Sequence, residues 1–285
     1  MVSLSTRQVV KWILRNTCKS KESLTPEITL RLITERCPMW MATPDQCPLP
    51  DPYWAFYWPG GQALTRFVLD HGQLFRGHRV LDFGSGCGAT SIAAIWSGAD
   101  HVFVNDIDTS AILASRLNFK LNKTVHSKVT FSNLNLLQPY NEPVWEAFIS
   151  VGNRYFQFIV FFSIILPMSH ETAYYDEIDA THFALWREGV GWGRRQKTYV
   201  LLGDMFYDTD FAMIVFKWLQ KVQSQGNVSI LVGDPGRHPL ADEKYRSQVG
   251  VKFEKHILHE YAALPYITKE HYGLTSLKVF HIHFL

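Results

Sequence analysis

Residues 78–99 read HRVLDFGSGCGATSIAAIWSGA, and this stretch indicates the fold class. It begins with a short apolar run that ends at Phe83 and is typical of a buried strand. Gly84, Gly86 and Gly88 follow, and a helix-length apolar segment comes directly after them. Such glycines let the backbone approach a ligand closely, and the start of the helix offers free N–H groups. The stretch therefore predicts a strand, a ligand-binding loop and a helix of an α/β sheet.

The same alternation of strands and helices continues toward the C-terminus. Strand patterns rich in Val, Ile and Phe recur at 101–108, 128–135, 199–208 and 227–236. Helix-length segments separate them. Two more apolar runs, 254–264 and 276–285, end the chain, and we expect them to form an antiparallel edge. The predicted fold is α/β: a Rossmann-like, seven-stranded, mostly parallel and doubly wound sheet with an antiparallel edge strand.

Composition limits the function classes. The 285 residues are 47% hydrophobic and 19% charged, as in an ordinary globular protein. The net charge of +2 and the lack of a basic stripe argue against a nucleic-acid partner. The four cysteines form no C-x-x-C pair, so we predict neither a zinc site nor disulfides, and we expect a reducing compartment.

The first 21 residues differ from the rest. Arg7, Lys11, Arg15 and Lys19 recur every four residues, acidic residues are absent, and apolar residues fall mostly on the other side of a helical wheel. This pattern predicts a mitochondrial transit peptide over 1–21 and a location in the mitochondrial matrix. The alternatives are a surface helix of the folded domain and a cytoplasmic location.

Two further segments complete the expected domain organisation. Residues 22–50 form an N-terminal extension with a short helix expected in LTPEITLRLITERCP (24–38), and the α/β domain spans 51–285. Within it, 147–199 separates the third and fourth strands by a connection far longer than is usual. Its apolar run, about 13 residues closed by Pro167, is too short to span a membrane. It is either a surface excursion or, the reading we favour, a splicing or gene-model product that disturbs the fourth strand.

Carboxylates lie where two of the predicted strands end. Asp82 comes two residues before the first loop glycine, where it suits a cationic sulfonium or amino group better than a pyrophosphate. Asp106 ends the next strand, where a carboxylate can accept both hydroxyls of a ribose. Asp82 could instead cap a helix or form a turn, and Asp106 with Asp108 could hold a metal, although no further ligands converge. The glycine spacing itself also fits a nicotinamide dinucleotide.

A second polar cluster follows the fourth predicted strand, in LLGDMFYD (201–208). Ligands of doubly wound sheets bind beyond the carboxyl ends of the strands. Asp204 and Tyr207 are therefore expected to face a ligand. The alternative is that Asp204 or Asp208 caps the next helix.

Five stretches together carry a family resemblance: DPYWAFYWPGGQAL, VLDFGSGCGATSIAA, NDID, LLGDMFYD and LVGDPGR. In this combination the chain resembles the seven-β-strand, S-adenosylmethionine-dependent protein lysine methyltransferases, within them the group that acts on the electron transfer flavoprotein β subunit. The resemblance covers roughly 45–146 and 200–285, and 147–199 departs from it.

The resemblance implies roles for single residues. Asp204 to Tyr207 matches the D-x-x-Y signature of the family, and our hypothesis is that Asp204 holds the incoming lysine ammonium and that Tyr207 aligns the amine. The cofactor contacts that the resemblance implies are Trp58, Gly84, Ser85, Gly86, Asp106, Asn133 and Gly203. Asp82, proposed above from its position before the glycine loop, completes the predicted cofactor site.

The expected function is thus an S-adenosylmethionine-dependent protein-lysine N-methyltransferase whose protein partner is the electron transfer flavoprotein β subunit. Two alternatives remain open from the sequence. One is an NAD(P)-dependent oxidoreductase on the same sheet. The other is a methyltransferase fold made inactive by 147–199 and kept as a binding module with chaperone-type contacts.

Overall fold

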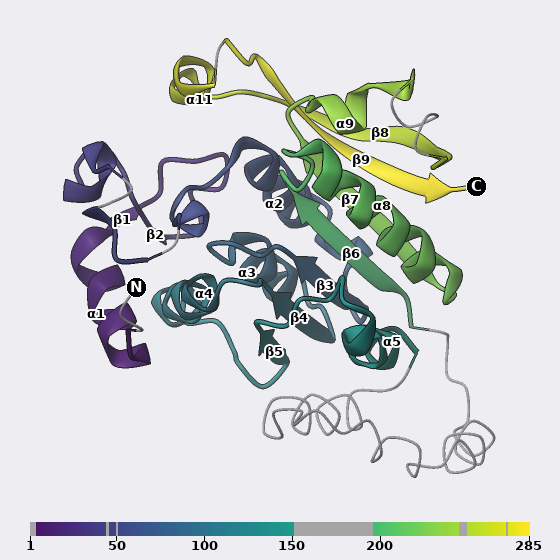
Figure 1. Ribbon diagram of the computed structural model, residues 1–285, viewed down its shortest axis with the longest axis horizontal. Coiled ribbons are helices and arrows are strands. Elements are labelled where there is room, and N and C mark those ends of the chain that lie inside the picture. Colours follow the sequence, from purple (N-terminus) through teal and green to yellow (C-terminus); the bar gives the residue numbers. More distant parts are fainter. Residues whose placement is uncertain (1–3, 44–45, 50, 151–195, 245–249, 272) are drawn as a thin grey trace.

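The computed structural model describes residues 4–43, 46–49, 51–150, 196–244, 250–271 and 273–285. Its main sheet has the strand order β5-β4-β3-β6-β7-β9-β8 (Figure 1). The strands are β3 (Arg79–Phe83), β4 (His101–Asn105), β5 (Val129–Ser132), β6 (Thr198–Gly203), β7 (Val228–Asp234), β8 (Phe253–Ala262) and β9 (Ser276–Phe284).

The direction of the strands confirms the predicted sheet. β3 to β7 are parallel, whereas β9 is antiparallel to β7 and to β8. β9 is therefore the reversed strand, and β8 at the edge runs in the direction of the other five. The two C-terminal apolar runs form this antiparallel region, as expected.

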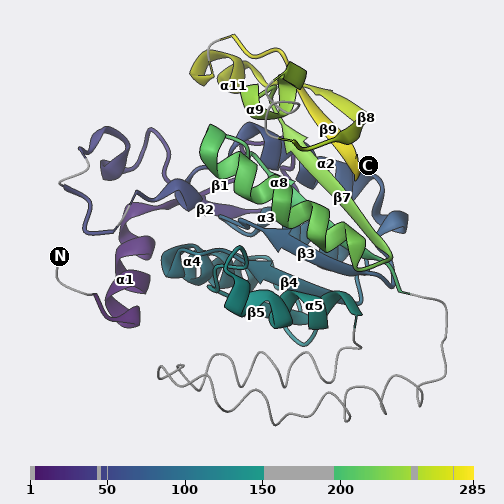
Figure 2. The same cartoon turned by 45° about the vertical axis from the view of Figure 1, so that its right-hand side comes forward.

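Helices cover both faces of the sheet (Figures 1 and 2). Neighbouring residues such as Val80 and Leu81 point to opposite faces, and both are fully buried, which is why β3 reads as a continuous apolar run. On the face of Val80 lie α2 (Pro59–Asp70), α3 (Ala89–Trp96) and α4 (Thr109–Leu121), and on the face of Leu81 lie α5 (Glu142–Ser150) and α8 (Thr209–Ser224). The short helices are η1 (Pro38–Met41), η3 (Tyr53–Ala55), η4 (Gly72–Leu74), η5 (Pro139–Asn141), α9 (His238–Ala241) and α11 (Pro265–Glu270).

The N-terminal region folds against the domain. Helix α1 (Thr6–Asn16) lies beside α4, which Figures 1 and 2 both show. This is the arrangement of the surface helix that was the alternative to a transit peptide. The short helix expected in 24–38 was wrong, because β2 (Leu30–Leu32) pairs there with β1 (Cys18–Ser20) in a small antiparallel sheet.

The predicted insertion lies mostly outside the described residues, which resume at Gln196 after Ser150. Its flanks are regular structure. Trp145 and Phe148 of α5 are buried against the sheet, and β6 pairs with β3 and β7 along its length. The fourth predicted strand is therefore complete and lies inside the sheet. Among the described helices, none has the length and apolar character needed to cross a membrane.

The start of α2 contacts the carboxyl ends of β6 and β7 directly, backbone against backbone. Gly60 lies against Gly233, and Gly61 lies against Gly203. A Cβ atom on Gly203 would come within 2.8 Å of the Gly61 Cα, so a side chain at Gly60, Gly203 or Gly233 would separate the helix from the strands. Glycine is needed here for close approach rather than for an unusual dihedral angle.

Substituting the two glycines of α2 separately tests this contact. A Cβ at Gly60 would overlap the Gly233 carbonyl oxygen and lie 2.6 Å from Asp204 Oδ2, whereas a Cβ at Gly61 meets nothing nearer than a Tyr57 ring carbon at 3.9 Å. We expect Gly60→Ala to lower the free energy of unfolding by about 1–3 kcal/mol. Gly61→Ala, the matched control, is expected to be neutral or stabilising by up to about 1 kcal/mol. Urea unfolding measures both, and equal effects would contradict the direct contact.

Candidate functional site

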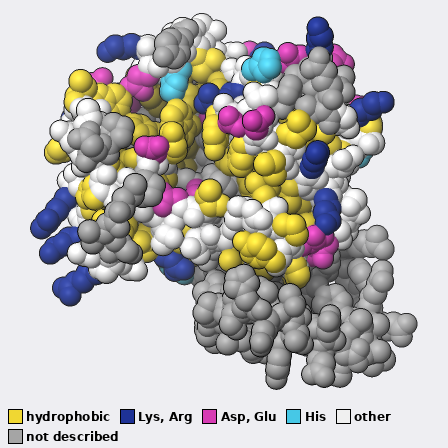
Figure 3. Space-filling model, viewed as in Figure 1, with side chains coloured by type: hydrophobic (Ala, Val, Ile, Leu, Met, Phe, Trp, Pro, Cys, Tyr) yellow, Lys and Arg dark blue, Asp and Glu magenta, His cyan; other side chains and the backbone are white. Residues whose placement is uncertain are grey.

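A cleft of about 1140 Å³ opens at the carboxyl ends of β3, β4 and β6. It is lined by the glycine loop, by the residues that follow β4 and β6, and by the aromatic segment before α2. Figure 3 shows the molecule hollowed near the middle of one face, with hydrophobic and acidic side chains at the edge of the hollow. The site therefore lies where the topology of a doubly wound sheet places ligands.

The glycine loop adopts the conformation that its sequence predicts. Gly84 and Gly86 have φ angles of 68° and 50°, and both line the cleft. Ser85 is buried, its backbone N–H donates to the Asn105 carbonyl oxygen at 2.9 Å, and its hydroxyl has no hydrogen-bond partner among the described residues. The loop thus presents backbone rather than side chains to the cleft.

Asp106 is held in place at the end of β4. Its Oδ2 accepts a hydrogen bond from Gly86 N at 2.9 Å, and its Oδ1 accepts one from Asp108 N at 3.0 Å. It lines the cleft, and burial raises its pKa to about 6. Asp108 accepts from Ser110 N at 2.7 Å and so caps α4, and no group of three metal-ligating side chains occurs in the described ranges.

Three predicted cofactor residues, Asp82, Asn133 and the buried Ser85, are not part of the cleft wall. Asp82 is 3% exposed and accepts a hydrogen bond from the Ser91 hydroxyl, and burial raises its pKa to about 7. Asn133 is exposed and donates to Thr109 Oγ1 at 3.1 Å. Asn135, two residues further along the chain, lines the cleft instead, as does Asn105 at the end of β4.

Asp204 makes more bonds than any other acid of the site. It has a φ of 57° and is 5% exposed. Its Oδ2 accepts from the backbone N–H groups of Gly60 and Gly61, and its Oδ1 accepts from Arg237 Nε at 3.1 Å and Nη2 at 2.8 Å. Burial raises its pKa, while Arg237 acts in the opposite direction. Asp204 therefore joins α2, β6 and the loop after β7, and the helix cap is Asp208, which accepts from Phe211 N at 2.8 Å.

Aromatic side chains surround the opening of the cleft. Tyr207 is 62% exposed, and its ring stacks on Phe211 with centroids 5.5 Å apart. Partial burial raises the pKa of Tyr207, so its phenol stays protonated near neutral pH. Trp58 lines the cleft, and its Nε1 donates to the Tyr53 carbonyl oxygen at 2.9 Å.

Sequence reasoning missed two residues of this site. Trp54 is 3% exposed and lines the cleft, and its Nε1 has no hydrogen-bond partner among the described groups. Arg237 lines the cleft and pairs with Asp204. Both belong to stretches that carry the family resemblance, but within the aromatic stretch only Trp58 was predicted to contact the cofactor, and Arg237 was given no role. The unpaired N–H of a buried indole is a signal that only coordinates reveal.

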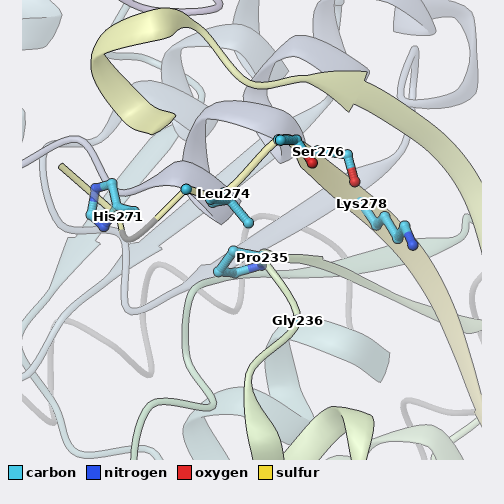
Figure 4. A pocket seen from close by; sticks show the side chains of 8 residues that line it. Pro235, Gly236, His271, Leu274, Ser276 and Lys278 are labelled. Carbon is cyan, nitrogen blue, oxygen red and sulfur yellow. The ribbon is translucent and has the colours of Figure 1, made fainter. Parts of the chain in front are cut away.

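A second, smaller hollow of about 350 Å³ lies next to the cleft (Figure 4). Its walls include Pro235 and Gly236 from the loop after β7, and Lys278 from β9. The same loop supplies Arg237 to the larger cleft, and the His271 ring at the smaller hollow lies 6.1 Å from the Trp58 ring. The loop after β7 therefore contributes to both hollows.

Comparisons with known proteins agree with this geometry. Residues 63–145 match the family model described as ribosomal protein L11 methyltransferase (PrmA). The chain is 44% identical over 284 residues, all of both proteins, to the electron transfer flavoprotein beta subunit lysine methyltransferase homolog of Caenorhabditis elegans. It is 35% identical over 260 residues to the Homo sapiens electron transfer flavoprotein beta subunit lysine methyltransferase, covering 91% of this chain and 76% of that one.

One similar solved structure is the N-methyltransferase NodS of Bradyrhizobium japonicum in complex with S-adenosyl-L-homocysteine. It is 10% identical, the match covers 81% of this chain and 91% of that one, and the TM-score is 0.43.

The buried Asp82 predicts a stability effect of definite sign. Its pKa is about 7 in the folded chain against an ordinary value of 3.8, so between about pH 4 and 7 only the unfolded chain releases the proton, and stability falls as the pH rises. Asp82→Asn removes this titration. The free energy of unfolding of the variant, relative to that of the unchanged protein, is expected to rise by about 2–4 kcal/mol between pH 5 and pH 8. Thermal unfolding of both proteins at the two pH values measures this difference. A difference between the two proteins that does not change with pH would contradict a buried, protonated Asp82.

Proposed function

Because the chain belongs to the electron transfer flavoprotein beta subunit lysine methyltransferase family, we propose that it methylates lysine side chains of that flavoprotein subunit with S-adenosylmethionine as methyl donor. The observation that carries the proposal is the 44% identity over the whole length of the nematode relative. The cleft at the carboxyl ends of the strands supports it, because this is where such a sheet binds a nucleoside.

The described residues fit this cofactor. A volume of about 1140 Å³ exceeds the usual range of small-molecule pockets, roughly 300–1,000 Å³, and leaves room for a substrate side chain. Asp106 would hold the ribose hydroxyls, and the backbone of Gly84 and Gly86 would lie along the cofactor. When bound, the cofactor supplies a methyl group on a positively charged sulfur.

The substrate lysine has to lose a proton before it can react. With a pKa near 10.4, deprotonation near neutral pH costs about 4–5 kcal/mol. Burial in apolar surroundings disfavours an ammonium and lowers its pKa. Tyr53, Trp58 and Tyr207 at the opening of the cleft are placed to provide such surroundings.

Asp204 and Tyr207 are proposed to receive the amine. Asp204 Oδ2 is bound to backbone N–H groups, whereas the partner of Oδ1 is the Arg237 side chain, which is 29% exposed. The substrate ammonium is proposed to replace the Arg237 guanidinium on Oδ1. The protonated phenol of Tyr207 then orients the amine, and the proton leaves to water.

Family membership does not favour the two alternative functions considered from the sequence. An oxidoreductase would need a nicotinamide cofactor, and Asp204 would have no part in its chemistry. Chaperone-type contacts with the protein substrate remain a prediction without support of their own.

A mitochondrial matrix location is a further part of the proposal. It is supported by the basic segment at the start of the chain, whose Arg7, Lys11, Arg15 and Lys19 are all exposed on or next to α1. Recovery of the chain in the matrix fraction of isolated mitochondria would support this location, and recovery in the cytosol would contradict it.

A methylation assay tests the function. The full chain, S-adenosylmethionine and purified electron transfer flavoprotein beta subunit are incubated, and peptide mass spectrometry is expected to show added methyl groups on lysine. The control is Asp106→Asn, in which weaker binding of the ribose is expected to lower methylation at limiting cofactor by about 10-fold or more. Binding of S-adenosylhomocysteine by the full chain without any methylation of this subunit would refute the proposed substrate.

Two neighbouring aspartates distinguish the proposed role of Asp204 from that of a helix cap. Asp204→Asn is expected to lower kcat by about 100-fold, because the charge that attracts the ammonium is lost. Its affinity for S-adenosylhomocysteine should change by less than about 3-fold, because the amide oxygen can still accept from the Gly60 and Gly61 N–H groups that shape the cleft, and the proposed contact is with the substrate. Asp208→Asn is the matched control, and it should keep near-normal kcat because Asn caps helices as well as Asp. A loss of cofactor affinity in Asp204→Asn equal to its loss of kcat would assign Asp204 to the cofactor instead.

A further inference from the structure

Helix α1 is fixed to the domain by an apolar face. Val9 is 8% exposed and Ile13 is fully buried. They belong to one cluster with Ala111 and Ala114 of α4 and with Trp54, the buried indole of the cleft. The basic side chains of the helix point away from this cluster and are exposed. The apolar side of the predicted targeting segment is therefore used in the fold.

Local hydrogen bonds cap the helix at both ends, and the strand that follows it is bound to the domain. At its start, the Ser5 backbone N–H donates to Gln8 Oε1 at 2.8 Å. At its end, the Thr17 hydroxyl donates to the Ile13 carbonyl oxygen at 2.6 Å, and the chain continues directly into β1. Strand β2, the partner of β1, is in turn bound to α4, because Arg31 N donates to Asn118 Oδ1 at 2.8 Å. Helix α1 is thus built into the domain rather than attached to it by one contact.

The start of α1 forms part of the cleft. Leu4, Thr6 and Val9 line it together with Ser110 and Leu113 of α4. This is the end of the cleft next to Asp106, the acid assigned to the ribose. The opposite end is formed by the residues that follow β6.

We propose that α1 is a wall of the cofactor site, in which Leu4, Thr6 and Val9 close the adenosine end of the cleft. The inference rests on the proposed function, since the ligand is the nucleoside part of the methyl donor. An adenine covered by these side chains is removed from water, which strengthens its binding through burial of apolar surface. A chain that loses the basic segment would lose this wall together with β1, so the enzyme that binds its cofactor has to retain the segment.

The test is calorimetry with S-adenosylhomocysteine on the full chain and on two variants. The double variant Leu4→Ala, Val9→Ala removes apolar atoms from the wall, and its dissociation constant is expected to rise about 10-fold. Leu14→Ala is the matched control, because Leu14 is an apolar residue of the same helix that is 44% exposed and does not line the cleft, so its dissociation constant should not change. Circular dichroism establishes that all three chains are folded.

The outcomes distinguish failure of the proposed function from failure of the proposed wall. If the full chain binds no S-adenosylhomocysteine, the proposed function itself fails. If the full chain and the double variant bind it with equal affinity, the function stands and the wall is refuted. Hydrogen exchange provides a second test on the unchanged chain. Exchange of the α1 amides is expected to slow by at least about 3-fold when S-adenosylhomocysteine is added. Exchange rates that do not change with this ligand would also refute the inference.

Discussion

One buried carboxylate joins three segments that are distant in the sequence, and the geometry of the cleft depends on it. Asp204, at the end of β6, accepts hydrogen bonds from the first turn of α2 and from Arg237 in the loop after β7. It can reach α2 only because Gly60 and Gly61 lie directly on the strand ends. A buried carboxylate is tolerated when its oxygens are paired, and here the pairing also fixes the distance between the aromatic segment and the sheet. The same group thus shapes the cleft and supplies its charge.

Much of the fold was predictable because burial on both faces leaves a clear pattern. β3 and β4 are buried at every position, and such strands read as apolar runs wherever they occur in the sequence. β2 was not predictable in this way. Its three residues, Leu30–Leu32, show only one alternation, and their pairing with Cys18–Ser20 depends on a long-range contact with α4. The sequence left two readings open for the segment of α1 for a related reason, since an amphipathic basic helix looks the same whether its apolar face meets a receptor or a domain.

The site was predictable where topology determines it. The glycine loop, Asp106 and the residues after β6 all follow strand ends, and parallel strands bring such residues to one edge of the sheet. Contacts set by tertiary approach were not predictable. Trp54 rather than Trp58 carries the buried unpaired N–H, and Asn135 rather than Asn133 lines the cleft. In each case neighbouring residues of the same type face different surroundings, and the sequence contains no information on which one turns inward.

The position of β6 has a consequence for how the protein is made. β3 pairs with β4 on one side and with β6 on the other, yet β6 is encoded far later than both. At ribosomal speeds of about 5–20 residues per second, β3 waits on the order of ten seconds for this neighbour. Throughout that interval the nascent chain presents an open, apolar strand edge, which is a template for pairing with other polypeptides.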